Sequence, residues 1–170
     1  MDSTKILWPK TVRLIHWAIA ILVTLNLFIL EEGDPPHRYI GYAAVFLVAI
    51  RFFYGFTTKT EASFQRLPLS FRELKRFLAA KARFEKIDYP GHNPAASWVY
   101  ILIWLCILCL AITGFMMGLD RFWGDETLEE IHELFSNAVL ALVVIHFIGI
   151  ALDSIQYKRK TWLGMITGKK

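Results

Sequence analysis

Four apolar stretches, each about as long as a lipid bilayer is thick, constrain this chain more than any other feature. They lie near residues 14–30, 39–56, 95–119 and 127–155. A helix needs about 20 mostly apolar residues to cross the hydrocarbon core of a bilayer. At 170 residues and 55% hydrophobic, the chain is too apolar for an ordinary soluble domain. We therefore predict an all-α membrane protein, a bundle of four transmembrane helices that forms a single domain over residues 1–170.

The first stretch does not have the features of a secretory leader that is removed. No small-x-small cleavage site precedes Glu31 and Glu32, which end the stretch. We therefore expect this segment to stay in the mature protein as the first span.

Basic residues are distributed unequally between the two sides of a four-span protein. Seventeen of the nineteen lysines and arginines lie before the first stretch, between Arg51 and Lys86, or after the fourth stretch. The positive-inside rule then predicts that both termini lie in the cytoplasm. Only Arg38 and Arg121 lie in the two outer loops, together with nine of the fifteen acidic residues. The charge pattern thus reflects topology and contact with lipid, and we expect no binding of nucleic acid.

The long inner connection contains an amphipathic segment near residues 70–86. Ser70 and Glu73 have the spacing of a capping box, and apolar and basic side chains alternate with helical periodicity after them. We predict a helix that lies on the inner membrane surface. Further along, Asn93 and Pro94 have the residue types of an N-cap and a first helical position, so the third span should begin there.

Four histidines occur at two depths of the predicted bundle. His132 and His146 are fourteen residues apart on the fourth stretch. On a helix this spacing is about 21 Å of rise and about 40° of net rotation, so both rings leave one face. Topology places His16 and His146 near the inner surface, and His37 and His132 near the outer surface. The sequence therefore predicts two stacked metal centres, and haem fits them best.

Two imidazoles can fill both axial positions of a haem iron. An iron with six ligands has no open position for substrate, so it suits electron transfer better than oxygen chemistry. The alternative is that each histidine forms only hydrogen bonds between helices. Four ionisable side chains within spans, matched in depth as two pairs, favour the haem interpretation.

Other polar residues lie at the same two levels. Arg13 and Arg51 are near the inner level and Arg38 is near the outer level, where guanidinium groups can pair with haem propionates. The alternative for each arginine is an extended side chain that reaches the interface. His92, at the inner mouth of the third span, is a candidate contact for a quinone or a propionate. The alternative is that His92 is only a residue at the interface where the third span begins.

Two glycines lie close to predicted ligands. Gly41 follows His37 by one turn, and Gly149 follows His146 by three residues. A glycine next to a ligand lets a flat macrocycle approach the backbone, although close packing of helices is an equally good explanation.

Sulfur-containing residues add little to this prediction. Cys106 and Cys109 form a C-x-x-C pattern without a following histidine, so covalent haem attachment is not indicated. Met116 and Met117 are available as axial ligands near the outer end of the third stretch, but His37 and His132 already complete that site.

Several motifs together resemble the bacterial cytochrome b561 family, especially its nickel–iron hydrogenase b-type cytochrome branch. They are V-R-L-I-H-W, H-R-Y-I-G-Y, G-H-N-P, I-H-E-L-F-S-N-A, V-V-I-H-F-I-G and M-I-T-G-K-K, and they span nearly the whole chain. The resemblance implies two b haems ligated by His16, His37, His132 and His146. It also implies electron transfer between a quinone, either ubiquinone or menaquinone, and a periplasmic redox protein such as a c-type cytochrome or a hydrogenase. Whether the chain also forms an oligomer stays open.

Two other functions remain as alternatives. Some members of the broad family oxidise superoxide and pass the electron to quinone, which requires a cationic pocket at the outer site. The few outer cations, Arg38 and Arg121, weigh against that function. A membrane anchor or transporter without haem is the third possibility, and an absorption spectrum distinguishes it from the first two.

Overall fold

The computed structural model describes residues 6–169 and is all-helical over that range. Two of the basic residues counted above, Lys5 and Lys170, lie outside it. Four helices are long and apolar enough to cross a membrane, as the sequence predicts. They are α1 (Lys10–Phe28), α2 (Pro35–Thr57), α4 (Pro94–Met117) and α5 (Glu126–Tyr157).

Local sequence signals determine where the spans begin. Two prolines occupy the first turn of α2, where their missing N–H groups would have no helical partner. Asn93 is the N-cap of α4, and its side chain accepts a hydrogen bond of 2.8 Å from the backbone N–H of Ala96. Asp125 similarly caps α5 through the N–H of Leu128 at 3.1 Å. The predicted start of the third span at Asn93 and Pro94 is confirmed.

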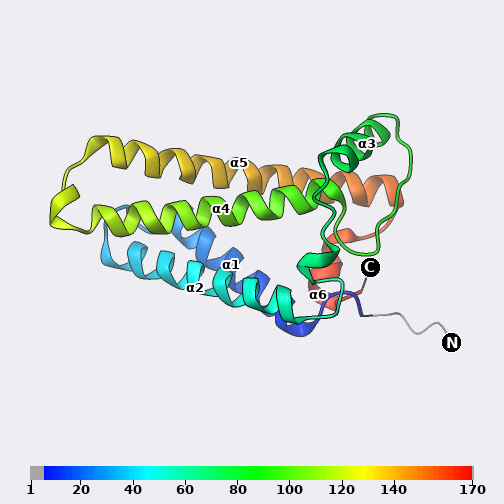
Figure 1. Ribbon diagram of the computed structural model, residues 1–170, viewed down its shortest axis with the longest axis horizontal. Helices are drawn as coiled ribbons and strands as arrows, with labels where there is room; N and C mark the ends of the chain where they lie inside the picture. The colour runs from blue at the N-terminus through cyan, green and yellow to red at the C-terminus, as the bar shows by residue number, and fades with distance from the viewer. Residues whose placement is uncertain (1–5, 170) are drawn as a thin grey trace.

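The four spans form two helix pairs that pack against each other. Helix α1 packs along α2, α4 packs along α5, and α2 contacts α4 (Figure 1). Val48, Ile107 and Val139 form the buried centre between α2, α4 and α5. Many large apolar side chains point outward, which suits a surface in contact with lipid. Helix α5, with 32 residues, is about 48 Å long and exceeds the hydrocarbon core.

Helix α3 (Phe71–Ala82) forms the amphipathic segment and is shorter than predicted. It begins after Ser70 as expected, but the Ser70 side chain makes no capping hydrogen bond, so the capping box is wrong. It ends at Ala82 because Phe84 adopts a left-handed conformation (φ 58°) and the N–H of Glu85 bonds back to the carbonyl of Ala80 at 2.9 Å. Such a reversal ends a helix in the same way as a Schellman motif.

Helix α3 lies near the C-terminal end of α5 (Figure 1), and a polar network connects the two. The Asp153 carboxylate accepts hydrogen bonds from Arg159 at 2.9 Å and from the Thr161 hydroxyl at 2.7 Å, and it lies 3.8 Å from Lys81 Nζ. Lys81 also donates to the side chain of Gln156. These contacts link the inner connection to the last span.

Short helices complete the two ends of the bundle. They are η1 (Phe64–Arg66), η2 (Asp120–Phe122), η3 (Thr161–Leu163) and α6 (Gly164–Thr167). Both described ends of the chain meet at the same end of the bundle, because the N–H groups of Leu7 and Trp8 bond to the carbonyl of Gly168 at 2.8 and 3.1 Å.

Candidate functional site

Two pairs of histidine rings face each other between helices. His16 of α1 and His146 of α5 have ring centroids 6.4 Å apart. His37 of α2 and His132 of α5 have ring centroids 6.3 Å apart. Since the two residues of α5 are separated by about 21 Å of helix rise, one pair lies toward each end of the bundle.

The spacing within each pair is that of two ligands of one metal ion. With a metal–nitrogen bond of about 2 Å on either side, the centroids of two opposed imidazoles lie about 6 Å apart. In both pairs the rings extend between helices that do not pack along each other, because α5 runs along α4 and α1 runs along α2. Among the described residues, Nδ1 of His16 and Nδ1 of His37 are buried without a hydrogen-bond partner. The residues present therefore fit an axially ligated haem in each pair.

The His132 ring has a polar contact that sequence reasoning missed. The hydroxyl oxygen of Thr113 on α4 lies 2.7 Å from His132 Nδ1. Next to it, a Cβ on Gly114 would lie 3.3 Å from His132 Cε1, so the glycine allows the ring to approach α4 closely. The sequence signal that could have indicated this contact is the polar Thr113 next to Gly114 within an otherwise apolar span.

The turn that carries His37 is also supported from a neighbouring helix. Asn26 of α1 donates a hydrogen bond of 3.2 Å from its side-chain amide to the backbone carbonyl of His37. A Cβ on Gly41 would lie 3.2 Å from that amide nitrogen, so Gly41, one of the two glycines singled out in the sequence, makes room for Asn26.

Arg51 and His92 both lie close to the Tyr100 ring. Arg51 is 5% exposed, and its guanidinium carbon is 5.7 Å from the Tyr100 ring centroid. Its Nη2 donates to the carbonyl of Ala62 at 2.8 Å, whereas its Nη1 has no partner among residues 6–169. The His92 ring stacks on the Tyr100 ring, and their centroids are 5.5 Å apart. The structure thus brings two of the predicted contact residues to one aromatic cluster.

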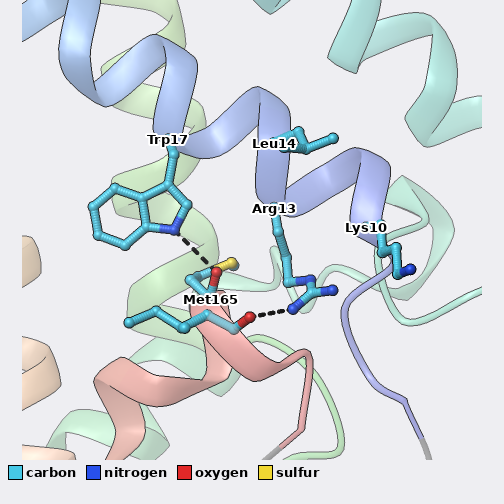
Figure 2. A pocket seen from close by; sticks show the side chains of 6 residues that line it. Lys10, Arg13, Leu14, Trp17 and Met165 are labelled. Carbon is cyan, nitrogen blue, oxygen red and sulfur yellow. Dashed lines mark hydrogen bonds between the residues drawn. The ribbon is translucent and has the colours of Figure 1, made fainter.

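Arg13 contacts the C-terminal segment of the chain (Figure 2). Its guanidinium donates to the carbonyl of Ile166, and one turn later the Trp17 indole donates to the carbonyl of Met165 at 3.0 Å. These bonds fasten the C-terminal segment to the turn of α1 that carries His16. An open pocket of about 330 Å³ lies here, lined by Lys10, Arg13, Leu14, Trp17, Met165 and Ile166.

Arg38 extends from the start of α2 to the end of α4. Its guanidinium lies against Gly118, the C-cap of α4, where a Cβ would collide with it. A cation at this position interacts favourably with the negative end of the helix dipole. The predicted contacts of Arg13 and Arg38 with propionates stay predictions.

A comparison against protein families agrees with the arrangement of four apolar spans. A family model described as prokaryotic cytochrome b561 matches residues 7–168. The chain belongs to the prokaryotic cytochrome b561 family. No curated protein and no solved structure matched the chain. Membership makes this cytochrome a multi-pass membrane protein and suggests electron transfer across the membrane through b-type haem, while the hydrogenase branch stays a prediction.

Proposed function

We propose that this cytochrome holds two b haems and transfers electrons across the bacterial inner membrane between a quinone and a periplasmic redox protein. The observation that supports this function best is the pair of ring separations, 6.4 Å and 6.3 Å, at opposite ends of one bundle. When bound, haem supplies one-electron oxidation and reduction, and two haems at different depths divide the crossing of the apolar core into shorter steps.

The chain's own residues provide ligation, exclusion of water and orientation. His16 and His146 would hold the inner haem, and His37 and His132 the outer haem. With an imidazole on both sides, the metal would have no vacant position for a substrate. The buried centre at Val48, Ile107 and Val139 excludes water between the two levels.

The aromatic cluster at the inner end is the proposed contact for quinone. Arg51 Nη1 and the Tyr100 hydroxyl are both buried without a hydrogen-bond partner among the described residues, and both can donate to a carbonyl oxygen. His92 stacks on Tyr100 and completes the group. The same donors would suit a propionate of the inner haem, so the cluster serves either group through the same chemistry.

The outer end has the charge expected for docking a basic redox protein. Its acidic residues lie between α1 and α2, around η2, and in the first two turns of α5. Such a surface attracts a cationic partner and speeds its association. The two outer cations are already engaged, because Arg38 lies against Gly118 and Arg121 lies over the Phe122 ring. Electron transfer to a protein partner is therefore favoured over oxidation of superoxide.

Replacement of single histidines tests the two haem sites. We expect His16→Ala and His146→Ala each to abolish the inner haem and to retain the outer haem. A pyridine haemochrome assay should then fall from about two haems per chain to about one, because a haem held by one imidazole dissociates more readily. His37→Ala is the matched control, because it removes a histidine of the other pair and should abolish the outer haem while it retains the inner one.

Two results would contradict the assignment. One is a colourless wild-type protein that stays colourless after haem is supplied in excess, which would favour an anchor or transporter. The other is loss of both haems, or of neither, when His146 is replaced, which would contradict the pairing.

A further inference from the structure

The Thr113 hydroxyl is arranged to accept a hydrogen bond from His132. Thr113 is 7% exposed, and its Oγ1 lies 2.9 Å from the carbonyl of Cys109 and 3.2 Å from that of Leu110 on its own helix. A hydroxyl has one hydrogen, and these two carbonyls can only accept. When the hydrogen points to them, the oxygen's lone pairs face His132 Nδ1 at 2.7 Å.

The two carbonyls that can accept from the Thr113 hydroxyl favour one tautomer of the His132 ring. Nδ1 carries the hydrogen and donates it to Thr113, so the lone pair of a neutral ring is on Nε2. Nε2 is then the nitrogen available to a metal between His132 and His37. Gly114 maintains the arrangement, because a Cβ there would press on His132 Cε1 at 3.3 Å.

The corresponding nitrogens of two other histidines have no such acceptor. Nδ1 of His16 and Nδ1 of His37 are buried with no hydrogen-bond partner in the described part of the chain. The bond to Thr113 therefore makes His132 a more basic ligand than a ring without an acceptor. A more basic ligand stabilises the ferric state of a haem iron relative to the ferrous state.

We propose that Thr113 is a positioning residue that holds the outer haem at a lower reduction potential than His37 and His132 would give alone. This proposal rests on the proposed function, because it assumes a haem in the outer pair.

A redox titration of purified protein containing both haems tests the proposal. Thr113→Val keeps the shape of the side chain and removes the acceptor. At an ambient potential near the outer midpoint, we expect the ferrous-to-ferric ratio of the outer haem to rise about fivefold, which corresponds to a hydrogen bond that is stronger by about 1 kcal/mol in the ferric than in the ferrous state. The inner haem should not change. The largest g value of the outer ferric haem should also shift in the electron paramagnetic resonance spectrum.

Three further variants separate this effect from structural damage. Thr113→Ser retains the hydroxyl and should leave the ratio near its wild-type value. Thr24→Val makes the same chemical change on α1, where the hydroxyl donates to the carbonyl of Ala20 at 2.8 Å, and should change neither haem. Gly114→Ala keeps Thr113 but pushes the ring away, so it should shift the ratio in the same direction as Thr113→Val. If the Thr113→Val protein does not fold and cannot be purified, the Gly114→Ala variant tests the proposal in its place.

The proposal fails if Thr113→Val binds both haems with an unchanged ratio, or if Thr113→Ser shifts the ratio as much as Thr113→Val. Either result would leave two haems in the protein and the proposed function intact. Failure of the proposed function is a different result, in which the wild-type chain binds no haem.

Discussion

At the scale of single residues, Gly149 keeps space open beside one histidine of the inner pair. A Cβ built on Gly149 meets nothing within 4 Å, and the residue lies one turn after His146 on α5. Among residues 6–169, no protein group near this position requires a glycine. The open space beside His146 is consistent with a bound haem.

Filling that space should weaken the inner site. We expect Gly149→Leu to lower the affinity for the inner haem about tenfold, because overpacking of about 1–3 kcal/mol would fall on the bound form only. Haem titration of the apoprotein, followed by absorption, measures the change. Ala151→Leu adds a similar volume on an exposed part of α5 and should retain both haems. If both variants lose the same affinity for the inner haem, the effect would come from larger side chains anywhere on α5 and not from the space beside His146.

The residues that carry the chemistry could be predicted from the sequence more readily than those that support them. Four histidines in apolar stretches stand out because ionisable groups there are costly. Thr113 and Asn26 do not stand out, since hydroxyl and amide groups occur in spans for many reasons. Their roles depend on which helices are neighbours, and periodicity carries no information about that. Arg13 also could not be predicted to bond to Ile166, 153 positions away in the chain.

At the scale of elements, one carboxylate fastens α3 to the bundle. Asp153 is a mostly buried side chain near the end of α5, and it accepts hydrogen bonds from Arg159 and Thr161 and attracts Lys81. The apolar contribution is small, because Phe77 and Ala80 are the buried residues of α3. The polar network therefore contributes substantially to holding this helix.

Removing the charge of Asp153 should loosen α3. We expect Asp153→Asn to raise amide hydrogen exchange in residues 71–82 about tenfold, since a hydrogen bond to a charged group contributes about 1.5 kcal/mol or more. The spectra of both haems should stay unchanged. Glu73→Gln, on the exposed surface of the same helix, should leave the exchange rates as they are. Exchange that is the same in both variants would mean that lipid contacts alone hold α3.

The four spans could be predicted to within four residues at every end, because length and hydropathy determine them. The boundaries of α3 could not, because they depend on single backbone conformations. Ser70 and Glu73 have suitable residue types, yet the Ser70 side chain forms no cap bond. Phe84 takes a positive φ, which is uncommon for a bulky residue and which no sequence pattern indicates.

At the scale of the whole molecule, the two ends of the bundle differ in charge and in construction. The end that carries α3, α6 and both described chain ends is basic, and the opposite end is acidic (Figure 1). The positive-inside rule predicts that the basic end is cytoplasmic. In that orientation the aromatic cluster at Arg51 would face the cytoplasm, and the His37 pair would face the periplasm.

Fusions to reporter enzymes test this orientation. We expect alkaline phosphatase to be inactive when fused after Lys170, and a green fluorescent protein at the same place to be bright, because the C-terminus should stay in the cytoplasm. Phosphatase fused after Gly33, in the loop between α1 and α2, is the matched control and should be active. The reverse pattern would mean that the protein has the opposite orientation in the membrane, and that the inner and outer sites must be exchanged.

Helix α5 provides one histidine to each pair, and this has a consequence for electron tunnelling. The tunnelling rate depends steeply on the distance between donor and acceptor. In the proposed arrangement of two haems, that distance would follow from the regular rise between His132 and His146, because both rings are attached to one continuous helix. Changes of loop length elsewhere in the chain would leave it unaltered. One extra residue inserted between the two histidines would turn one ring by about 100° and disconnect the sites.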